Sequence, residues 1–218
     1  MKRLVGVSLA ALLLAACKAP LRPDTGVSAT PGSTEELAAA VAQDSRRSDS
    51  ESDSKIREQL ASDAARNADA CLALAPQAAA CLYSRALALG LQARAHPLHA
   101  ADYLNGMLAA LSGAEAAAPD YDQAGPARVR ALVLVRAPGW PLGPGDADAG
   151  LAAARRAVAL KPLYPPNWLA QAEAQSKTGD LSGARESFLR ARDLAQGLPP
   201  SPDRDDWLRE ADQGLRHN

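Results

Sequence analysis

The chain has few of the residue types on which most catalytic and metal sites depend. Its 218 residues include three His, three Cys and one Phe. Lys plus Arg number 24 against 25 Asp plus Glu, so the basic excess that binds nucleic acid is missing. The sequence also lacks a Gly-rich phosphate loop and a G-x-S-x-G nucleophile elbow. We therefore predict a protein with no enzymatic activity, no cofactor and no nucleic-acid partner.

Two of the histidines have a spacing that suits a metal, but no third ligand accompanies them. His96 and His99 stand three residues apart in "HPLH", and Pro97 breaks the helix that would align them. The acids of residues 43–54 have neither the spacing nor the central glycine of a calcium loop. We predict no metal site, and interpret residues 43–54 as a solvated connection before a helix that begins near Lys55.

Long apolar runs are absent except at the N-terminus. Lys2 and Arg3 precede an uncharged run, residues 4–16, which has the length of a secretory signal and is too short to span a bilayer. The run ends in "LAAC", which resembles the lipobox of bacterial lipoproteins. The resemblance implies cleavage before Cys17 and acylation of that cysteine. The alternative is an ordinary signal peptide followed by a chance cysteine.

The predicted lipid places the protein in the cell envelope. Residues 1–16 are the expected signal peptide, and residues 17–33 are the lipidated cysteine with a flexible tether rich in Pro, Gly, Ser and Thr. Lys18 stands where some bacteria use aspartate to retain lipoproteins in the inner membrane. We expect a protein that faces the periplasm, anchored by its lipid to the outer rather than the inner membrane.

The two remaining cysteines form an even pair. Cys71 and Cys81 are ten residues apart, and Pro76 lies between them. In an oxidising compartment this pattern favours a disulfide that joins the end of one helix to the start of the next. A metal site with two cysteine ligands is the alternative, but no histidine lies nearby in the sequence.

From Ser33 onward the chain consists of Ala- and Leu-rich segments with helical spacing, broken at Gly and Pro. Ser33 and Glu36 have the spacing of a capping box at the first of these segments. No run of alternating β-branched residues indicates a strand. Residues 34–218 are therefore predicted to form one all-α domain.

Two segments of this domain repeat each other. "GDADAGLAAARRAVALKP" begins at Gly145 and "GDLSGARESFLRARDLAQ" begins at Gly179, 34 residues later, which is the tetratricopeptide period. Gln171 and Gln175 depart from the repeat, which normally has Leu and an aromatic there, so this unit packs less well inside or has a polar face. The remaining buried positions of the second unit are taken by Trp168, Ala172, Ala184, Phe188 and Ala191.

Three prolines extend the repeat upstream. Pro76, Pro119 and Pro162 end helical segments at intervals of 43 residues, which indicates the same hairpin with longer helices or loops. The length allows three to four hairpins and a last helix over residues 203–215, where Trp207 would cover the final hydrophobic edge. The predicted fold is an α-solenoid of tetratricopeptide-like hairpins with a C-terminal capping helix.

One connection has more Gly and Pro than a hairpin turn needs. Residues 121–146, "YDQAGPARVRALVLVRAPGWPLGPGD", resemble the T component of tripartite ATP-independent periplasmic (TRAP) transporters, a family of repeat-containing lipoproteins. The resemblance implies a non-catalytic helical protein that associates with the transporter's solute-binding protein, in some cases as an oligomer with a central channel. It is carried by Gly125, Pro126, Arg128, Pro138, Trp140, Pro141, Leu142, Gly145 and Asp146.

The candidate partner-binding residues are Tyr121, Arg128 and Trp140. A structural alternative exists for each of them, since Arg128 could pair with a nearby acid and Trp140 and Tyr121 could each fill a hydrophobic gap. Two other functions also fit a solenoid of this kind. They are a general scaffold for envelope assembly and a binder of small hydrophobic ligands.

Overall fold

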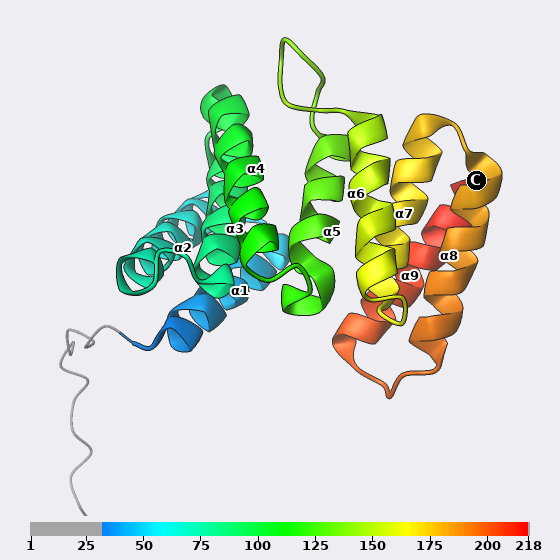
Figure 1. Ribbon diagram of the computed structural model, residues 1–218, viewed down its shortest axis with the longest axis horizontal. Coiled ribbons are helices and arrows are strands. Elements are labelled where there is room, and N and C mark those ends of the chain that lie inside the picture. The colour runs from blue at the N-terminus through cyan, green and yellow to red at the C-terminus, as the bar shows by residue number, and fades with distance from the viewer. Residues whose placement is uncertain (1–31, 218) are drawn as a thin grey trace, which may run out of the picture. The chain divides into compact units, whose positions relative to one another are not determined.

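The computed structural model of the protein describes residues 32–217 (Figure 1). The predicted signal peptide, Cys17 and nearly all of the tether lie outside these residues. The fold is all-α, as predicted, because residues 32–217 contain no β-strand beyond one isolated bridge between Gly139 and Gly145. No helix in this range is both long and apolar enough to cross a bilayer.

Nine α-helices and one short 3-10 helix follow one another along residues 32–217. Consecutive helices pack against each other, so that α1–α2, α3–α4, α5–α6 and α7–α8 form four hairpins and α9 packs on α8 and α7. Their bounds are α1 (Thr34–Ser50), α2 (Ser54–Leu74), α3 (Ala79–Ala95), η1 (Pro97–His99), α4 (Ala100–Ala117), α5 (Tyr121–Arg136), α6 (Ala147–Leu160), α7 (Pro165–Thr178), α8 (Leu181–Gln196) and α9 (Pro202–His217).

The 43-residue spacing of the prolines corresponds to three equivalent turns between hairpins. Helices α2, α4 and α6 end at the C-cap residues Ala75, Ala118 and Lys161, whose backbones share one conformation, with φ of −146°, −154° and −137°. A proline follows each cap, and the residue before a proline is disfavoured in the helical region, so each helix must end there. All three turns lie at the lower end of the molecule in Figure 1.

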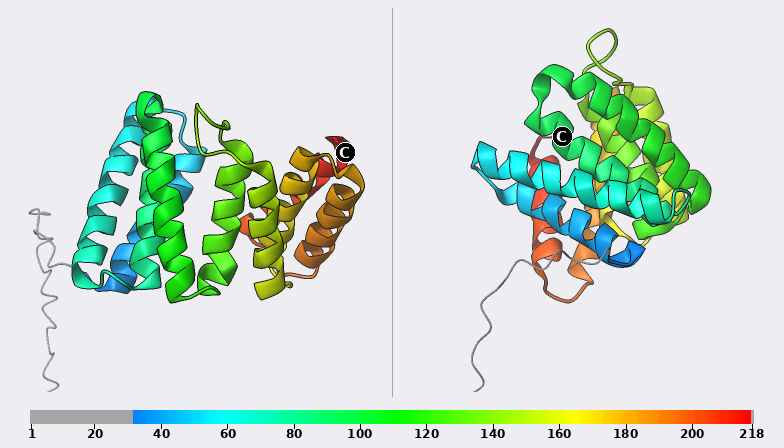
Figure 2. Two further views of the ribbon diagram at one scale, coloured as in Figure 1. Left: turned by 45° about the horizontal axis from the view of Figure 1, so that its top comes forward. Right: turned by 90° about the vertical axis from the view of Figure 1, so that its left-hand side faces the viewer.

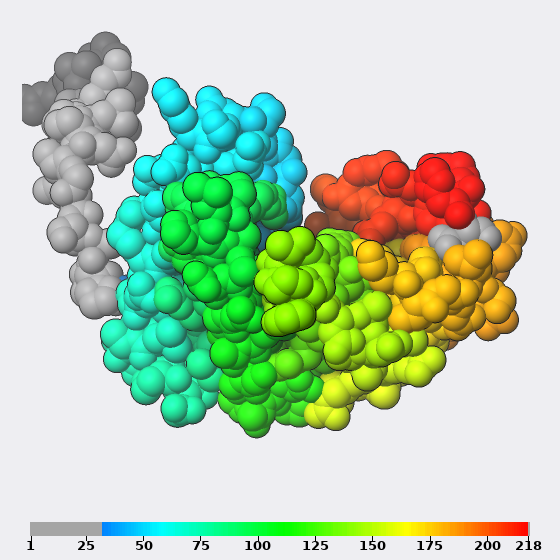
Figure 3. Space-filling view, turned by 90° about the horizontal axis from the view of Figure 1, so that it is seen from above, coloured from blue at the N-terminus to red at the C-terminus, as the bar shows by residue number. Residues whose placement is uncertain are grey.

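The odd-numbered helices form one face of the solenoid. Helices α1 and α3, α5 and α7, and α7 and α9 contact each other across the hairpins (Figure 2). Helices α3 and α5 contact each other less than the other neighbouring pairs do. This face is hollowed between α1–α2 and α9, the cyan and red parts of Figure 3.

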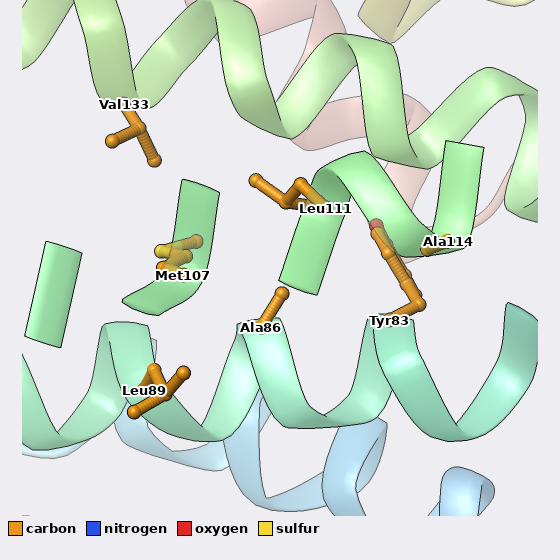
Figure 4. Close-up of a cluster of buried hydrophobic side chains, with 7 residues drawn as sticks. All are labelled: Tyr83, Ala86, Leu89, Met107, Leu111, Ala114 and Val133. Carbon is orange, nitrogen blue, oxygen red and sulfur yellow. The ribbon is translucent and has the colours of Figure 1, made fainter. Parts of the chain in front are cut away.

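Small residues allow the helices to approach closely. Most fully buried positions in the helix interfaces are alanines, such as Ala64, Ala68 and Ala154, because bulk between helix axes would force them apart. Larger side chains gather where α3, α4 and α5 meet. That cluster, shown in Figure 4, consists of Tyr83, Ala86, Leu89, Met107, Leu111, Ala114 and Val133.

The predicted pairing of Cys71 and Cys81 is confirmed. Their sulfur atoms lie 2.02 Å apart, and both side chains are fully buried. The bond joins the last turn of α2 to the first turn of α3, across the turn that contains Pro76.

The expectation of a solvated connection over residues 43–54 was wrong. Helix α1 continues to Ser50, and three residues separate it from α2, which begins at Ser54, close to the predicted start. The polar side chains form the outer face of a helix whose inner face holds Val41 and the buried Ser48. Arg94 of α3 donates hydrogen bonds to the Ser48 carbonyl (3.4 Å) and the Asp49 carboxylate (2.9 Å), which fixes the last turn of α1.

The two glutamines that depart from the repeat both lie in α7 and share one hydrogen-bond partner on α8. Gln171 of α7 donates to the Ser187 hydroxyl of α8 (3.2 Å), and that hydroxyl donates to the Gln175 side-chain oxygen (2.6 Å). Gln175 and Ser187 are buried. The departure from the repeat is therefore accommodated by a polar bridge between α7 and α8.

Helix α9 covers the last hydrophobic edge, as predicted, with Trp207 packed on the cluster around Phe188. A Cβ atom at Gly214 would overlap the Phe188 ring. We expect Gly214→Ala to lower the free energy of unfolding by about 1–3 kcal/mol, because the overlap outweighs the higher helix propensity of Ala.

Gly197→Ala is the matched control for this substitution. Gly197 has φ −75°, and the nearest atom would lie 3.5 Å from an added Cβ. The free energy of unfolding of Gly197→Ala is therefore expected to stay within about 0.5 kcal/mol of that of the wild type. Urea denaturation followed by circular dichroism measures both variants. A Gly214→Ala protein as stable as Gly197→Ala would contradict the packing of α9 on α8.

Candidate functional site

The three candidate residues from the sequence do not come together. Tyr121 is the first residue of α5, Arg128 lies within that helix, and Trp140 lies in the loop after its end. In Figure 1 the start of α5 is at the lower end of the molecule and the loop of residues 137–146 is at the upper end. Trp140 is therefore remote from Tyr121 and Arg128, which both lie near the start of α5.

Helix α5 begins with an unusual backbone. Asp122, Gln123 and Ala124 have φ values of 47°, 56° and 63°, in the left-handed region that residues other than Gly seldom adopt. Regular helix follows from Gly125 and Pro126, and a proline suits a first helical turn because its missing N–H has no helical partner there. The Gly-Pro pair thus precedes a short helix, as the sequence indicated.

Arg128 holds this backbone in place. It is 9% exposed, and its guanidinium donates to the Asp122 carboxylate (2.9 Å) and to the carbonyls of Asp122 (3.2 Å) and Gln123 (3.0 Å). It also donates to the Asn167 side-chain oxygen (3.1 Å) and lies 5.1 Å from the centre of the Tyr164 ring. The structural alternative for Arg128, pairing with a nearby acid, is confirmed, and its contacts leave little surface for a partner.

Two tyrosines complete the surroundings of Asp122. The Tyr83 hydroxyl donates to the Asp122 carboxylate (2.9 Å), and Tyr121 packs edge-on against the Tyr83 ring with centres 5.5 Å apart. Burial raises the pKa of Tyr83 far above its ordinary value, so this phenol stays protonated and remains a donor. Burial also raises the pKa of the half-buried Tyr121.

Asn167 is a central residue of this region that sequence reasoning missed. It is fully buried in α7, and its side-chain amide donates to the carbonyls of Gln123 (3.1 Å), Ala157 (3.1 Å) and Lys161 (3.0 Å). The amide therefore ties α7 to the end of α6 and to the left-handed start of α5. A polar residue in the first turn of a helix carries no sequence signal for such a role.

Trp140 is displayed to solvent by a closed loop. Its side chain is 90% exposed, so the alternative that it caps a hydrophobic gap was wrong. The loop is closed at its base where Gly145 N–H donates to the Pro138 carbonyl (2.9 Å) and Asp146 N–H donates to the Leu134 carbonyl (2.9 Å). A Cβ atom at Gly145 would overlap the backbone of Ala137 and Pro138, so this closure requires glycine.

A cavity of about 500 Å³ opens between α1, α3, α4 and α5. A second cavity of about 260 Å³ shares Ser45 and Leu87 with it and continues toward Tyr121 at the start of α5. We call the two together the inner groove. Its apolar walls are formed by Leu87, Leu91, Leu104, Met107, Val129, Leu132 and Val133.

Charged side chains stand at both ends of the inner groove. At one end Arg94 pairs with Asp49 (2.9 Å), and Arg136 makes two hydrogen bonds to Glu173 (2.8 and 2.6 Å). At the other end the second cavity is lined by Asp122, which pairs with Arg128 (2.9 Å). Arg46 of α1 also lines the second cavity and makes no ion pair with any residue between 32 and 217. The inner groove is thus lined mainly by apolar side chains, with ion pairs at both ends and one unpaired cation along it.

Protein-family models and curated proteins were compared with the chain, and neither gave a match.

The candidate surfaces suit binding. Within residues 32–217 no group of three or more His, Cys, Asp or Glu is placed to hold a metal ion. His96 caps the end of α3 and lies 6.1 Å from the ring of Tyr103, and His99 is exposed at the end of η1. What the described part of the chain offers a partner is the inner groove and the Trp140 loop, of which the sequence indicated only the second.

Proposed function

We propose that the protein is a non-catalytic, lipid-anchored periplasmic adaptor that binds a protein partner in the inner groove. The observation that carries this proposal is the apolar lining of the groove, which draws side chains from four helices onto one concave surface. Solenoids use such surfaces to bind partners, because stacked hairpins supply an extended, preformed shape. The face of an amphipathic helix or an apolar chain segment would fill it.

The length of the inner groove supports an occupant of this kind. The groove follows α5 from Tyr121 to Arg136, and a helix of that length is roughly 22 Å long. This matches about four turns of helix or about seven residues of extended chain.

The partner we propose is the solute-binding protein of a TRAP-type transporter. The support is the resemblance of residues 121–146 to the T component, together with the lipobox that ends at Cys17. A lipid anchor and a short tether would keep the domain close to the membrane, where a periplasmic solute-binding protein delivers its cargo.

A charge inside the groove should prevent this binding. Leu132 lines the groove without being fully buried, so Leu132→Lys places an ammonium against the partner's apolar surface without opening the core. We expect recovery of the partner to fall at least about tenfold. Leu181→Lys is the matched control, since Leu181 is 53% exposed at the start of α8 and does not line the groove.

The measurement is crosslinking in the cell envelope, pull-down and mass spectrometry of the acylated protein, with circular dichroism to verify folding. Recovery of a solute-binding protein with wild type and Leu181→Lys, and its loss with Leu132→Lys, supports the proposal. Recovery of envelope-assembly proteins alone would instead favour a general scaffold. A small apolar molecule retained by the purified protein, and lost with Leu132→Lys, would favour a ligand binder.

A further inference from the structure

A second apolar surface lies at the upper end of the molecule in Figure 1, next to the end of the inner groove that Ala137 and Pro138 line. It consists of η1, the first turns of α4 and the loop of residues 137–146, and we call it the Trp140 tip. Leu98 is 97% exposed, Trp140 is 90% exposed and Leu142 is 75% exposed. These three side chains belong to two neighbouring segments.

The two segments of the Trp140 tip are adjacent although they are far apart in sequence. Ala101 and Asn105 of α4 line a cavity of about 330 Å³ together with Trp140, Pro141 and Asp146. Leu98 lies in η1, three residues before Ala101 in the sequence. The apolar side chains are therefore presented on one end of the molecule.

Because Trp140 is exposed, its side chain does not contribute the stability that burial would give. Burying a large apolar side chain contributes about 1.5–3 kcal/mol relative to leaving it exposed. The loop instead closes on its own backbone, and Pro138, Pro141 and Pro144 restrict it further, so Trp140 is held outward. A loop whose backbone is already restricted loses less conformational entropy on binding, and Trp is among the residues that most often dominate binding energies.

The charged side chains within the two segments of the tip are acidic. Residues 95–105 and 137–148 contain no Lys or Arg, and they contain the exposed acids Asp102, Asp146 and Asp148. The arginines just outside these segments, Arg94 and Arg136, already pair with Asp49 and Glu173 beside the inner groove. A complementary surface would therefore be apolar at its centre and basic at its edge.

We infer that the Trp140 tip is a second docking surface, which inserts Trp140 into an apolar pocket of a protein partner whose rim carries Lys and Arg. An anionic bilayer is a poorer occupant, because its surface potential repels the three acids that surround the tip. The inference rests on the proposed function only in that the partner is a protein. The side chains changed in the tip variants do not line the inner groove, so Leu132→Lys and the tip variants are read separately.

Site-specific photocrosslinking in the envelope tests the occupant. The photoreactive residue p-benzoylphenylalanine replaces Leu142 at the tip, or Leu163 as a control, which is 72% exposed in the turn before α7. We expect position 142 to crosslink a protein, at a peptide that borders an apolar pocket with a basic rim, and position 163 to give no such product. Crosslinking to lipid, to a second copy of this chain, or equally from both positions would overturn the inference.

The partner identified in this way is then purified, and its affinity for the acylated full chain is measured with tip variants. Trp140→Ala should weaken binding about thirtyfold, and Trp140→Phe by less. The double variant Asp102→Lys, Asp148→Lys should also weaken binding, because the two new ammonium groups would repel the basic rim of the partner. Leu163→Ala should leave the affinity unchanged. Unchanged affinity for Trp140→Ala or for the charge reversal contradicts the inference, whatever Leu132→Lys does in the groove.

Discussion

Replacing Arg128 by Ala is expected to lower the free energy of unfolding by about 3 kcal/mol, the largest effect we predict for any single side chain. The substitution removes four hydrogen bonds and the contact with the Tyr164 ring. The carbonyls of Asp122 and Gln123 lose their charged donor, and Asn167 loses a partner in a fully buried site. Asp122 is 45% exposed on its side chain, so its carboxylate regains water and limits the loss.

The backbone beside Arg128 makes this loss larger than that of an ordinary ion pair. Three successive residues, Asp122 to Ala124, adopt left-handed conformations. For a residue other than Gly this conformation costs about 1–2 kcal/mol. Such strain persists only where neighbouring groups hold it, and here the holders are Arg128 and Asn167. Without Arg128 the start of α5 should relax and loosen its packing on α7.

Arg85→Ala is the matched control. Arg85 also joins two helices, with Asp69 of α2 at 2.8 Å, but its side chain is 33% exposed and that of Asp69 is 63% exposed. Its loss should therefore cost less than about 1 kcal/mol. Urea denaturation followed by circular dichroism measures both proteins, and equal stabilities would show that the Arg128 network does not hold the start of α5.

The motif that resembles the T component thus divides into two parts with different roles. Gly125, Pro126 and Arg128 build a buried corner between α5 and α7, where the side chains contact their own chain. Trp140 and Leu142 face solvent on a loop whose glycines and prolines serve closure. Sequence spacing grouped these residues together, because a motif records order along the chain and carries no information on which side chains are buried.

Features set by local chain chemistry were predictable from the sequence. The turns after α2, α4 and α6 follow from prolines that end helices, and the cysteine pairing follows from two thiols separated by one such turn. The inner groove was not predictable, because it depends on α3 and α5 standing apart, which no local pattern records. The extent of α1 was missed for another reason, since a helix with one solvated face can be mostly polar over its last two turns.

Replacing both Cys71 and Cys81 by Ala is expected to lower the free energy of unfolding by about 2.5 kcal/mol. The crosslink closes a loop of ten residues, and a loop of that size restricts the unfolded chain by about this amount. For a chain of this length the melting temperature should fall by roughly 5–10 °C. Reduced wild-type protein should match the double variant.

The fold itself provides the internal control for this prediction. The turns after α4 and α6 have the same cap conformation as the turn after α2, and neither carries a disulfide. The turn therefore forms without the crosslink, so the double variant should keep its native helical circular dichroism and a cooperative transition. Because the effect lies in the unfolded state, the loss should appear as a lower urea midpoint, and a midpoint equal to that of the oxidised protein would contradict it.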